Sequence, residues 1–118
     1  MIRVIPWSAP MAQKLSRALG STHIVELIGE EVRQGISQLW ECSSEKHHAY
    51  CVTRLDRNPI EWCIVAFEGS GLMEFGPQFI AAARSRGVPL RAHVADKRVE
   101  RMVRWLGMRP TETVLRVA

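Results

Sequence analysis

The sequence predicts an α/β domain in which helices pack on a mixed, mainly antiparallel sheet. Three segments rich in β-formers, 36–42, 49–55 and 60–67, follow one another with short polar turns between them, a pattern typical of an antiparallel meander. After Gly71 the apolar residues alternate between the helical and the strand period. The 118-residue chain is 47% hydrophobic, which is enough to form one hydrophobic core.

The first part of the chain predicts a short strand followed by two helices. Residues 2–5 are a strand-like apolar run, and residues 9–19 carry apolar side chains near helical spacing. Gly20 ends this first helix, because glycine adopts the left-handed conformation that closes many helices. Ser21 or Thr22 then suits the N-cap of a second helix.

Glycines also end the later predicted helices. Gly35 weakens a helix interior by roughly 1 kcal/mol relative to alanine, so we expect the second helix to end there and 36–42 to be a strand. Pro77 suits the first turn of a third helix, which ends at Gly87. A fourth helix ends at Gly107, after a basic stretch with helical apolar spacing.

Two further strands complete the predicted sheet. Residues 88–94 alternate apolar and other side chains, and 113–117 is a β-branched run. Asp96 can cap the helix between them. The predicted order is strand, two helices, three strands, helix, strand, helix and strand, which gives a mixed sheet with helices packed on it.

The composition of the chain indicates in which cellular compartment the protein is expected. No apolar run approaches the ~18 residues that a membrane-spanning helix needs, and the N-terminal stretch lacks a signal-peptide pattern. The three cysteines are odd in number, which favours a reduced compartment over a disulfide framework. We therefore expect a cytoplasmic protein with no membrane contact.

Positive charge is concentrated in the last part of the chain. Residues 84–118 hold nine of the sixteen Lys and Arg residues against three acids, so this part carries +6 and the rest carries −2. The asymmetry fits either an anion-binding face or a solvated helix face. Lys97, Arg101 and Arg104 share one side of the fourth helix, but no aromatic residues are interleaved with them as in a single-strand stacking platform. Nucleic acid is therefore not an expected partner.

Two other groups of residues have alternative interpretations. Cys42, His47, His48 and Cys51 offer zinc-binding atoms, but adjacent turn histidines and cysteines on two paired strands do not match the usual zinc spacings, so no metal is expected. The four tryptophans are interpreted mainly as core residues, and an exposed one could anchor a dimer or a partner.

The C-terminal half resembles a known family. The strand "IEWCIVAF", the helix end "AAARSRG", the strand "VPLRAHV" and the helix "KRVERMVRWLG" follow the order found in the GNAT superfamily of N-acetyltransferases. Leu106-Gly107-Met108 is similar to the Leu-Gly-Phe signature that ends the last helix in this superfamily. The resemblance implies a single GNAT-like domain over residues 1–118, with the glycine turning the chain back into the sheet.

A narrower similarity is to small GNAT-like proteins of tailed bacteriophages. The segments "GISQLW", "AYCVTRL", "ARSRG" and "RWLG" carry it. This resemblance implies a phage or prophage protein with a role in virion assembly or host interaction. It would bind a phage or host protein, form a homo-oligomer in some settings, and lie in the host cytoplasm or in the virion.

The superfamily resemblance also implies an acetyl-CoA site. Its pyrophosphate motif, Gln/Arg-x-x-Gly-x-Gly/Ala, corresponds to "AFEGSG", which gives Phe67, Gly69, Ser70 and Gly71 as cofactor-binding candidates. Ala66 stands where the motif has Arg or Gln, and Glu68 adds a negative charge. Pro77 predicts that the helix begins later than the motif requires. A simple strand-end turn is the alternative interpretation of these glycines.

The catalytic candidates are incomplete. Many members place a tyrosine acid where this chain has Val103, and an asparagine where it has Asp96. Glu61, Glu68 and His93 are candidates for the general base by location, and their alternative is an ordinary exposed or strand position.

Two functions therefore stay open. One is a GNAT-like phage protein with a degenerate acetyl-CoA site, and the other is an active N-acetyltransferase that moves an acetyl group from acetyl-CoA to an amine.

Overall fold

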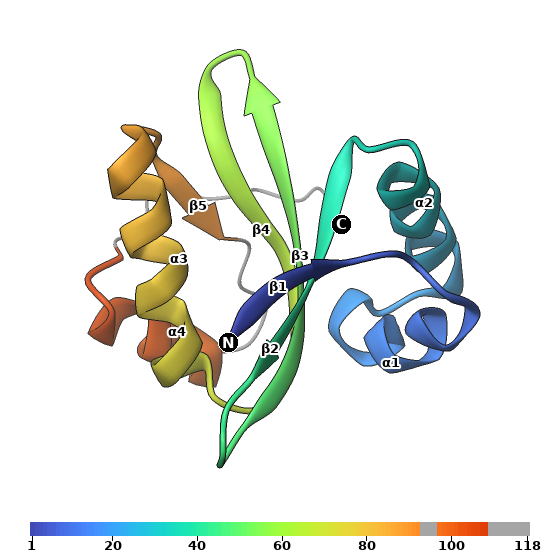
Figure 1. Cartoon of the computed structure of the whole chain (residues 1–118), viewed down its shortest axis with the longest axis horizontal. Helices are drawn as coiled ribbons and strands as arrows, with labels where there is room; N and C mark the ends of the chain where they lie inside the picture. The colour runs from blue at the N-terminus through green and yellow to red at the C-terminus, as the bar shows by residue number, and fades with distance from the viewer. Residues whose placement is uncertain (93–96, 109–118) are drawn as a thin grey trace, which may run out of the picture.

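The structure, a computed structural model, describes residues 1–92 and 97–108. Over these residues the chain forms one five-stranded sheet in the order β1-β2-β3-β4-β5, with two helices on each face (Figure 1). The strands are β1 (Ile2–Ile5), β2 (Ser37–Ser43), β3 (His48–Arg57), β4 (Ile60–Gly69) and β5 (Leu90–Ala92). The helices are α1 (Ala9–Leu19), α2 (Thr22–Arg33), α3 (Leu72–Arg86) and α4 (Lys97–Trp105).

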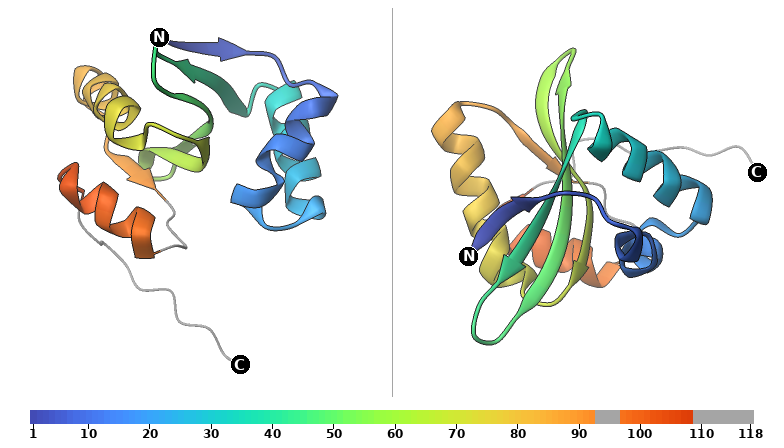
Figure 2. Two further views of the ribbon diagram at one scale, coloured as in Figure 1. Left: turned by 90° about the horizontal axis from the view of Figure 1, so that it is seen from below. Right: turned by 45° about the vertical axis from the view of Figure 1, so that its right-hand side comes forward.

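The sheet is mixed, as the sequence predicts. The first four strands pair antiparallel in sequence order, which confirms the predicted meander. The pairing of β5 with β4 is parallel, with Trp62 opposite Leu90 and Ile64 opposite Ala92. A parallel neighbour needs a crossover connection, and α3 provides it. Helices α1 and α2 cover one face of the sheet, whereas α3 and α4 cover the other (Figure 2).

The first helices begin and end where the sequence indicates. Gly20 closes α1 in the left-handed conformation with φ +78°. Ser21 is the N-cap of α2, and its hydroxyl accepts a hydrogen bond from the Ile24 N–H at 3.1 Å. Helix α2 ends at Arg33, and Gly35 has φ +77°, so the chain leaves the helix there and enters β2.

The prediction that α3 begins near Pro77 is wrong. The helix begins at Leu72, directly after Gly71, and Pro77 lies inside it. Proline removes one intrahelical hydrogen bond, but Phe75 and Phe79 on either side are 0% and 3% exposed. Their burial against the sheet holds the helix together across the proline.

The hydrophobic core lies in two layers, one on each side of the sheet. The α3 side packs Cys42, Ala49, Cys51, Trp62, Phe75, Phe79 and Ala83. The α1–α2 side packs Met11, Leu15, Ile28, Leu39, Val52 and Ala66. Both faces of β3 and β4 are therefore buried over much of their length, which explains their almost continuous apolar sequences.

A β-bulge interrupts the pairing of β3 with β4. Val52 pairs with Ala66, and the next residue, Thr53, pairs with Ile64, so Val65 is the extra residue. As a result Val65 and Ala66 both pack on the α1–α2 side of the sheet. Bulges increase the local twist of a strand, and this one lies midway along the strand that ends at the candidate site.

The structure describes only part of the predicted C-terminal elements. The predicted strand 88–94 is present as β5 over Leu90–Ala92, and it pairs with β4, which contains the predicted strand 60–67. The Asp96 cap, residues 93–94 and the strand 113–117 lie outside the described residues. None of the helices within the described ranges is long and apolar enough to cross a membrane.

Truncation of Phe75 tests the core. Phe75→Ala is expected to lower the free energy of unfolding by about 3–5 kcal/mol, because it leaves a cavity under α3. Gln78→Ala, an exposed change on the same helix, should alter it by less than about 0.5 kcal/mol. Urea denaturation, monitored by circular dichroism, measures the free energy of unfolding of both variants. Equal effects of the two substitutions would contradict the described packing of α3.

Candidate cofactor site at the β4–α3 junction

The turn between β4 and α3 forms the candidate site. Gly69 and Gly71 have φ of +128° and +90°, values that L side chains rarely adopt. The N–H groups of Glu74 and Phe75 donate to the Gly71 carbonyl at 2.9 and 2.8 Å. The N–H groups of Leu72 and Met73 open the helix and have no intrahelical acceptor. Together with the positive end of the helix dipole, they form an arrangement that attracts anions.

The β2–β3 hairpin holds this turn in place. The Ser70 N–H donates to the His48 carbonyl at 3.0 Å, and the Ser70 hydroxyl lies 3.1 Å from His47 Nδ1. Ser44 Oγ donates to a Glu74 carboxylate oxygen at 3.0 Å. Two segments distant in sequence, the β2–β3 hairpin and the β4–α3 turn, are thereby fixed to one another at one end of the sheet.

Close packing gives the two glycines a structural reason of their own. A Cβ added at Gly71 would lie 2.6 Å from His47 Cβ, and one at Gly69 would lie 2.5 Å from the His48 carbonyl oxygen. The strand-end interpretation of the G-x-G pattern is therefore supported. The backbone amides of the helix opening remain compatible with a bound pyrophosphate, since the hairpin packs on the Cβ side of the glycines.

Side chains at the turn supply no positive charge. Ala66, at the position where the superfamily motif has Arg or Gln, is 7% exposed and packs in the core on the α1–α2 side. Glu68 and Glu74 flank the turn with negative charge. Phe67 points to the other face and packs partly against the α3-side core. The junction thus fits a pyrophosphate in its backbone, and a cation would have to come from another element.

The structure separates the general-base candidates. Glu61 lies near the start of β4, where Arg91 Nη1 approaches its Oε2 at 3.4 Å. Glu68 lies near the other end, roughly 20 Å away by the rise of a strand, opposite Tyr50 of β3. His93 lies outside the described residues. Glu61 and Glu68 therefore cannot act on one proton together.

Glu61 belongs to a chain of charges that sequence reasoning missed, because no local signal joins its members. Arg91 also reaches Asp56 at 3.1 Å, Asp56 pairs with Arg54 at 2.8 Å, and Arg54 lies 3.8 Å from Glu31 of α2. Five side chains from α2, β3, β4 and β5 thus alternate in sign. The pairing of β5 with β4 brings Arg91 to this network, so its position depends on the parallel strand.

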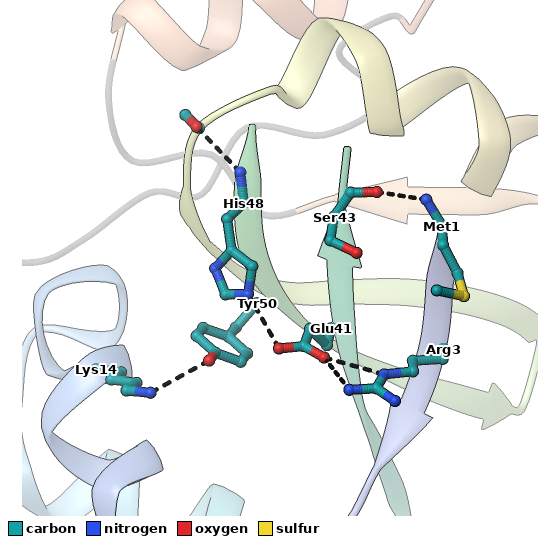
Figure 3. Close-up of polar contacts among 8 residues, drawn as sticks. Met1, Arg3, Lys14, Glu41, Ser43, His48 and Tyr50 are labelled. Atoms are coloured by element: carbon teal, nitrogen blue, oxygen red, sulfur yellow. Dashed lines mark hydrogen bonds and ion pairs between the residues drawn. The ribbon is translucent and has the colours of Figure 1, made fainter. Parts of the chain in front are cut away.

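A second polar cluster lies on the α1 side of the sheet (Figure 3). Arg3 donates to Glu41 from Nε at 3.0 Å, and His48 Nε2 lies 3.0 Å from the other Glu41 oxygen. These hydrogen bonds, from His48 first and Arg3 second, hold the pKa of Glu41 below its usual value. Tyr50, the chain's single tyrosine, accepts a hydrogen bond from Lys14 Nζ at 3.2 Å and lies on β3, as predicted.

Cys42, His47, His48 and Cys51, the candidates for zinc ligands, do not form a shared site in the described part of the chain. Cys42, Cys51 and Cys63 are buried as free thiols, and burial raises the pKa of Cys42 to about 11. Within residues 1–92 and 97–108, no group of three or more His, Cys, Asp and Glu side chains is placed to hold a metal ion. His47 and His48 instead bond to Ser70 and Glu41.

Comparison with solved structures identifies the fold. The aminoglycoside 6'-N-acetyltransferase AAC(6')-IG of Acinetobacter haemolyticus matches 100% of this chain and 97% of its own, with a TM-score of 0.64 at 10% identity. A probable acetyltransferase matches 98% and 99%, with a TM-score of 0.56 at 8% identity. Wild-type TTHA1254 of Thermus thermophilus matches 98% and 95%, with a TM-score of 0.52 at 18% identity.

These likenesses show that the chain has the fold of GNAT-type acetyltransferases, as the sequence predicted. No protein-family model matches the sequence, and no curated protein sequence is significantly similar to it.

The packing of Gly71 can be tested against a matched glycine. Gly71→Ala is expected to lower the free energy of unfolding by about 2–4 kcal/mol, from the left-handed backbone and from overlap with His47. Gly87→Ala has a similar backbone, with φ +66°, but no atom within 4 Å, so it should cost only about 1 kcal/mol. Thermal denaturation and urea denaturation compare them. His47→Gly, which removes the Cβ and Cγ that lie 2.6 and 2.8 Å from the added methyl group, should partly restore the stability of Gly71→Ala. Equal losses at the two glycines would contradict the described hairpin contact.

Proposed function

We propose that the chain is a member of the GNAT superfamily, a single domain over residues 1–118, that binds acetyl-CoA at the β4–α3 junction and transfers its acetyl group to an amine. The observation that carries this proposal is the start of α3 at Leu72, directly after the turn. The sequence predicted that this helix would begin late, near Pro77, which argued against a cofactor site. The observed start at Leu72 removes that objection. The fold similarity to acetyltransferases supports the same assignment.

The amide groups of Leu72 and Met73 are assigned to the pyrophosphate. They lie at the positive end of α3, and phosphate binds readily at such a terminus. The Ser70 hydroxyl is already bonded to the β2–β3 hairpin, so its role is to hold the turn, together with Gly69 and Gly71. Bound acetyl-CoA would supply an acetyl thioester, and Phe67 lies on the strand that leads to the turn.

Glu61 is the preferred general base. In acetyl-CoA the thioester is at the far end of the pantetheine arm from the pyrophosphate, so a base for the incoming amine belongs away from the turn. Glu68 lies beside the turn, where its charge would oppose the phosphates. Glu61 lies near the start of β4, away from the turn, and its carboxylate is held by Arg91, which orients it to accept a proton. His93 remains an alternative base.

A non-catalytic role is the second candidate, and the position of Ala66 favours it. A buried alanine cannot replace the motif's Arg or Gln, and Val103 cannot act as an acid. In this alternative the acetyl-CoA site is degenerate. The protein is then a phage or prophage component with a virion-assembly or host-interaction role, alone or as a homo-oligomer, in the host cytoplasm or the virion.

Calorimetric titration with acetyl-CoA at moderate salt distinguishes the candidates. Binding, with acetyl transfer to a panel of primary amines, is the expected result. Glu61→Gln should keep the cofactor affinity and lower the transfer rate about 10²–10⁴-fold, because the proton acceptor is lost. Glu26→Gln, an exposed change on α2, is the matched control and should leave the rate unchanged.

Three results would overturn parts of this proposal. No heat of binding at millimolar acetyl-CoA would reject the cofactor assignment. Binding without transfer to any amine would favour the non-catalytic candidate, for which co-purification with virion or host proteins is the corresponding test. Equal rates for Glu61→Gln and the wild type would reject Glu61 as the base.

A further inference from the structure

A pocket that is open to solvent lies between α3 and α4. It has a volume of about 430 Å³ and is lined by Met73, Arg101, Met102 and Trp105. Trp105 is 82% exposed, which makes it the most exposed large hydrophobic side chain of the described residues. Helix α4 lies close to α3, because a Cβ added at Gly76 would be 2.6 Å from Leu106 Cδ1. An exposed indole beside two adaptable thioethers is an apolar surface of the kind that marks a contact with another molecule.

This α3–α4 pocket has an apolar end and a cationic end. Arg101 precedes Trp105 by four residues, so the two side chains lie on one side of α4, about 6 Å apart along its axis. Within the described part of the chain no ion pair joins Arg101 to another side chain, whereas Arg104 pairs with Glu100 at 2.9 Å. An occupant that complements the pocket therefore carries an apolar side chain and a carboxylate about one helical turn apart.

Helix α2 carries such a row on its outer side. Ile24 and Leu27 are exposed, Leu27 by 53%, and the exposed Glu30 follows one turn later. The spacing of three residues places these side chains along one ridge of the helix. The carboxylate of Glu30 contacts Arg33 at 3.5 Å and Gln34 at 3.0 Å, which follow it in the chain. Exposed local contacts of this kind are weak, so Glu30 is free to take another partner.

The ridge and the pocket match when α2 and α4 lie antiparallel. Along α2 the apolar side chains come before the carboxylate, and along α4 the guanidinium comes before the indole. An antiparallel contact therefore places Leu27 against Trp105 and brings the two charged groups together. Leu27 and Glu30 are about 4.5 Å apart along the axis of α2. This separation is close to the spacing of Arg101 and Trp105, and flexible side chains close the remaining difference.

The two surfaces of one molecule cannot meet each other, because α2 and α4 cover opposite faces of the sheet (Figure 2). A second copy of the chain can bring its α2 to the pocket. Charge favours this contact over a two-fold contact between two α4 helices. Residues 84–118 carry +6 and the rest of the chain carries −2, so a two-fold contact would bring like charges together.

We propose that the α3–α4 pocket binds helix α2 of a second copy of this chain. In this contact Leu27 of one copy packs against Trp105 of the other, and the carboxylate of Glu30 pairs with the guanidinium at the cationic end. The contact joins two different surfaces, so every pair leaves one pocket and one α2 ridge free, and further copies add head to tail as a ring or a filament. This inference goes beyond the proposed function, since it involves neither acetyl-CoA nor Glu61.

Two complementary variants test the docking. Trp105→Glu places a charge in the pocket and keeps the α2 ridge, whereas Leu27→Glu places a charge on the ridge and keeps the pocket. Analytical ultracentrifugation should show that the mass of the wild type grows with protein concentration and that each variant alone stays monomeric. An equimolar mixture of the variants should form a one-to-one dimer and nothing larger, because only one intact pocket and one intact ridge can meet. Both side chains are exposed, and formation of this dimer also shows that both variants are folded.

Charge reversal tests the register of the two helices. Arg101→Glu and Glu30→Arg, each alone, should weaken self-association about tenfold, because like charges then meet. The double variant should recover the wild-type affinity, since the pair is restored with its signs exchanged. Arg57→Glu, an exposed charge reversal at the end of β3, is the matched control and should associate as the wild type does.

Four results would overturn this inference. A wild type that stays monomeric up to millimolar concentration would show that no second copy fills the pocket. Self-association of Leu27→Glu equal to that of the wild type would assign the pocket to a two-fold contact through α4. A mixture of the two complementary variants that stays monomeric, while the wild type associates, would reject the head-to-tail arrangement. Equal losses for Arg101→Glu and Arg57→Glu would reject the pairing with Glu30.

Discussion

The parallel pairing of β5 with β4 is the constraint on which the site depends. Antiparallel neighbours can be joined by tight turns, but a parallel neighbour requires the chain to cross the sheet and return. Helix α3 makes this crossing and packs Phe75 and Phe79 into the core. It must therefore begin where β4 ends, which places its positive terminus at that end of the sheet. The same pairing brings Arg91 to Glu61 near the other end of β4.

The Gly69–Gly71 turn has both a packing role and a possible binding role. The turn requires glycine at both positions because the backbone φ is positive there. His47 and the β3 backbone also occupy the space that side chains would need. The glycine pattern is therefore explained by packing alone, and it would persist in a protein that had lost its cofactor. The turn is a candidate binding site because α3 begins directly after it and presents free backbone N–H groups there. A binding function would consequently depend on the opening amides of α3.

Much of the fold could be predicted from periodicity and glycine positions, because these signals act within one element. Gly20, Ser21 and Gly35 are local signals, and the ends of α1 and α2 follow them. Pro77 gave a wrong prediction of the start of α3, because proline is common in a first helical turn. In the structure the burial of Phe75 and Phe79 stabilises α3 on both sides of the proline. Contacts between Arg3, Glu41 and His48, or between Arg91 and Glu61, join separate elements. They depend on strand register and packing, for which a single sequence gives no signal. The glycines and Glu61 could be named as candidates, but their separation along β4 required the structure.

The central claim is that the opening amides of α3 hold the cofactor's pyrophosphate. Backbone amide resonances of the ¹⁵N-labelled chain, followed during titration with coenzyme A, test it most directly. The account predicts that the resonances of Leu72 and Met73 shift downfield and saturate with the ligand, because their N–H groups gain charged acceptors. Saturable shifts that leave these two resonances in place, with the largest changes on α1 or α2, would contradict it.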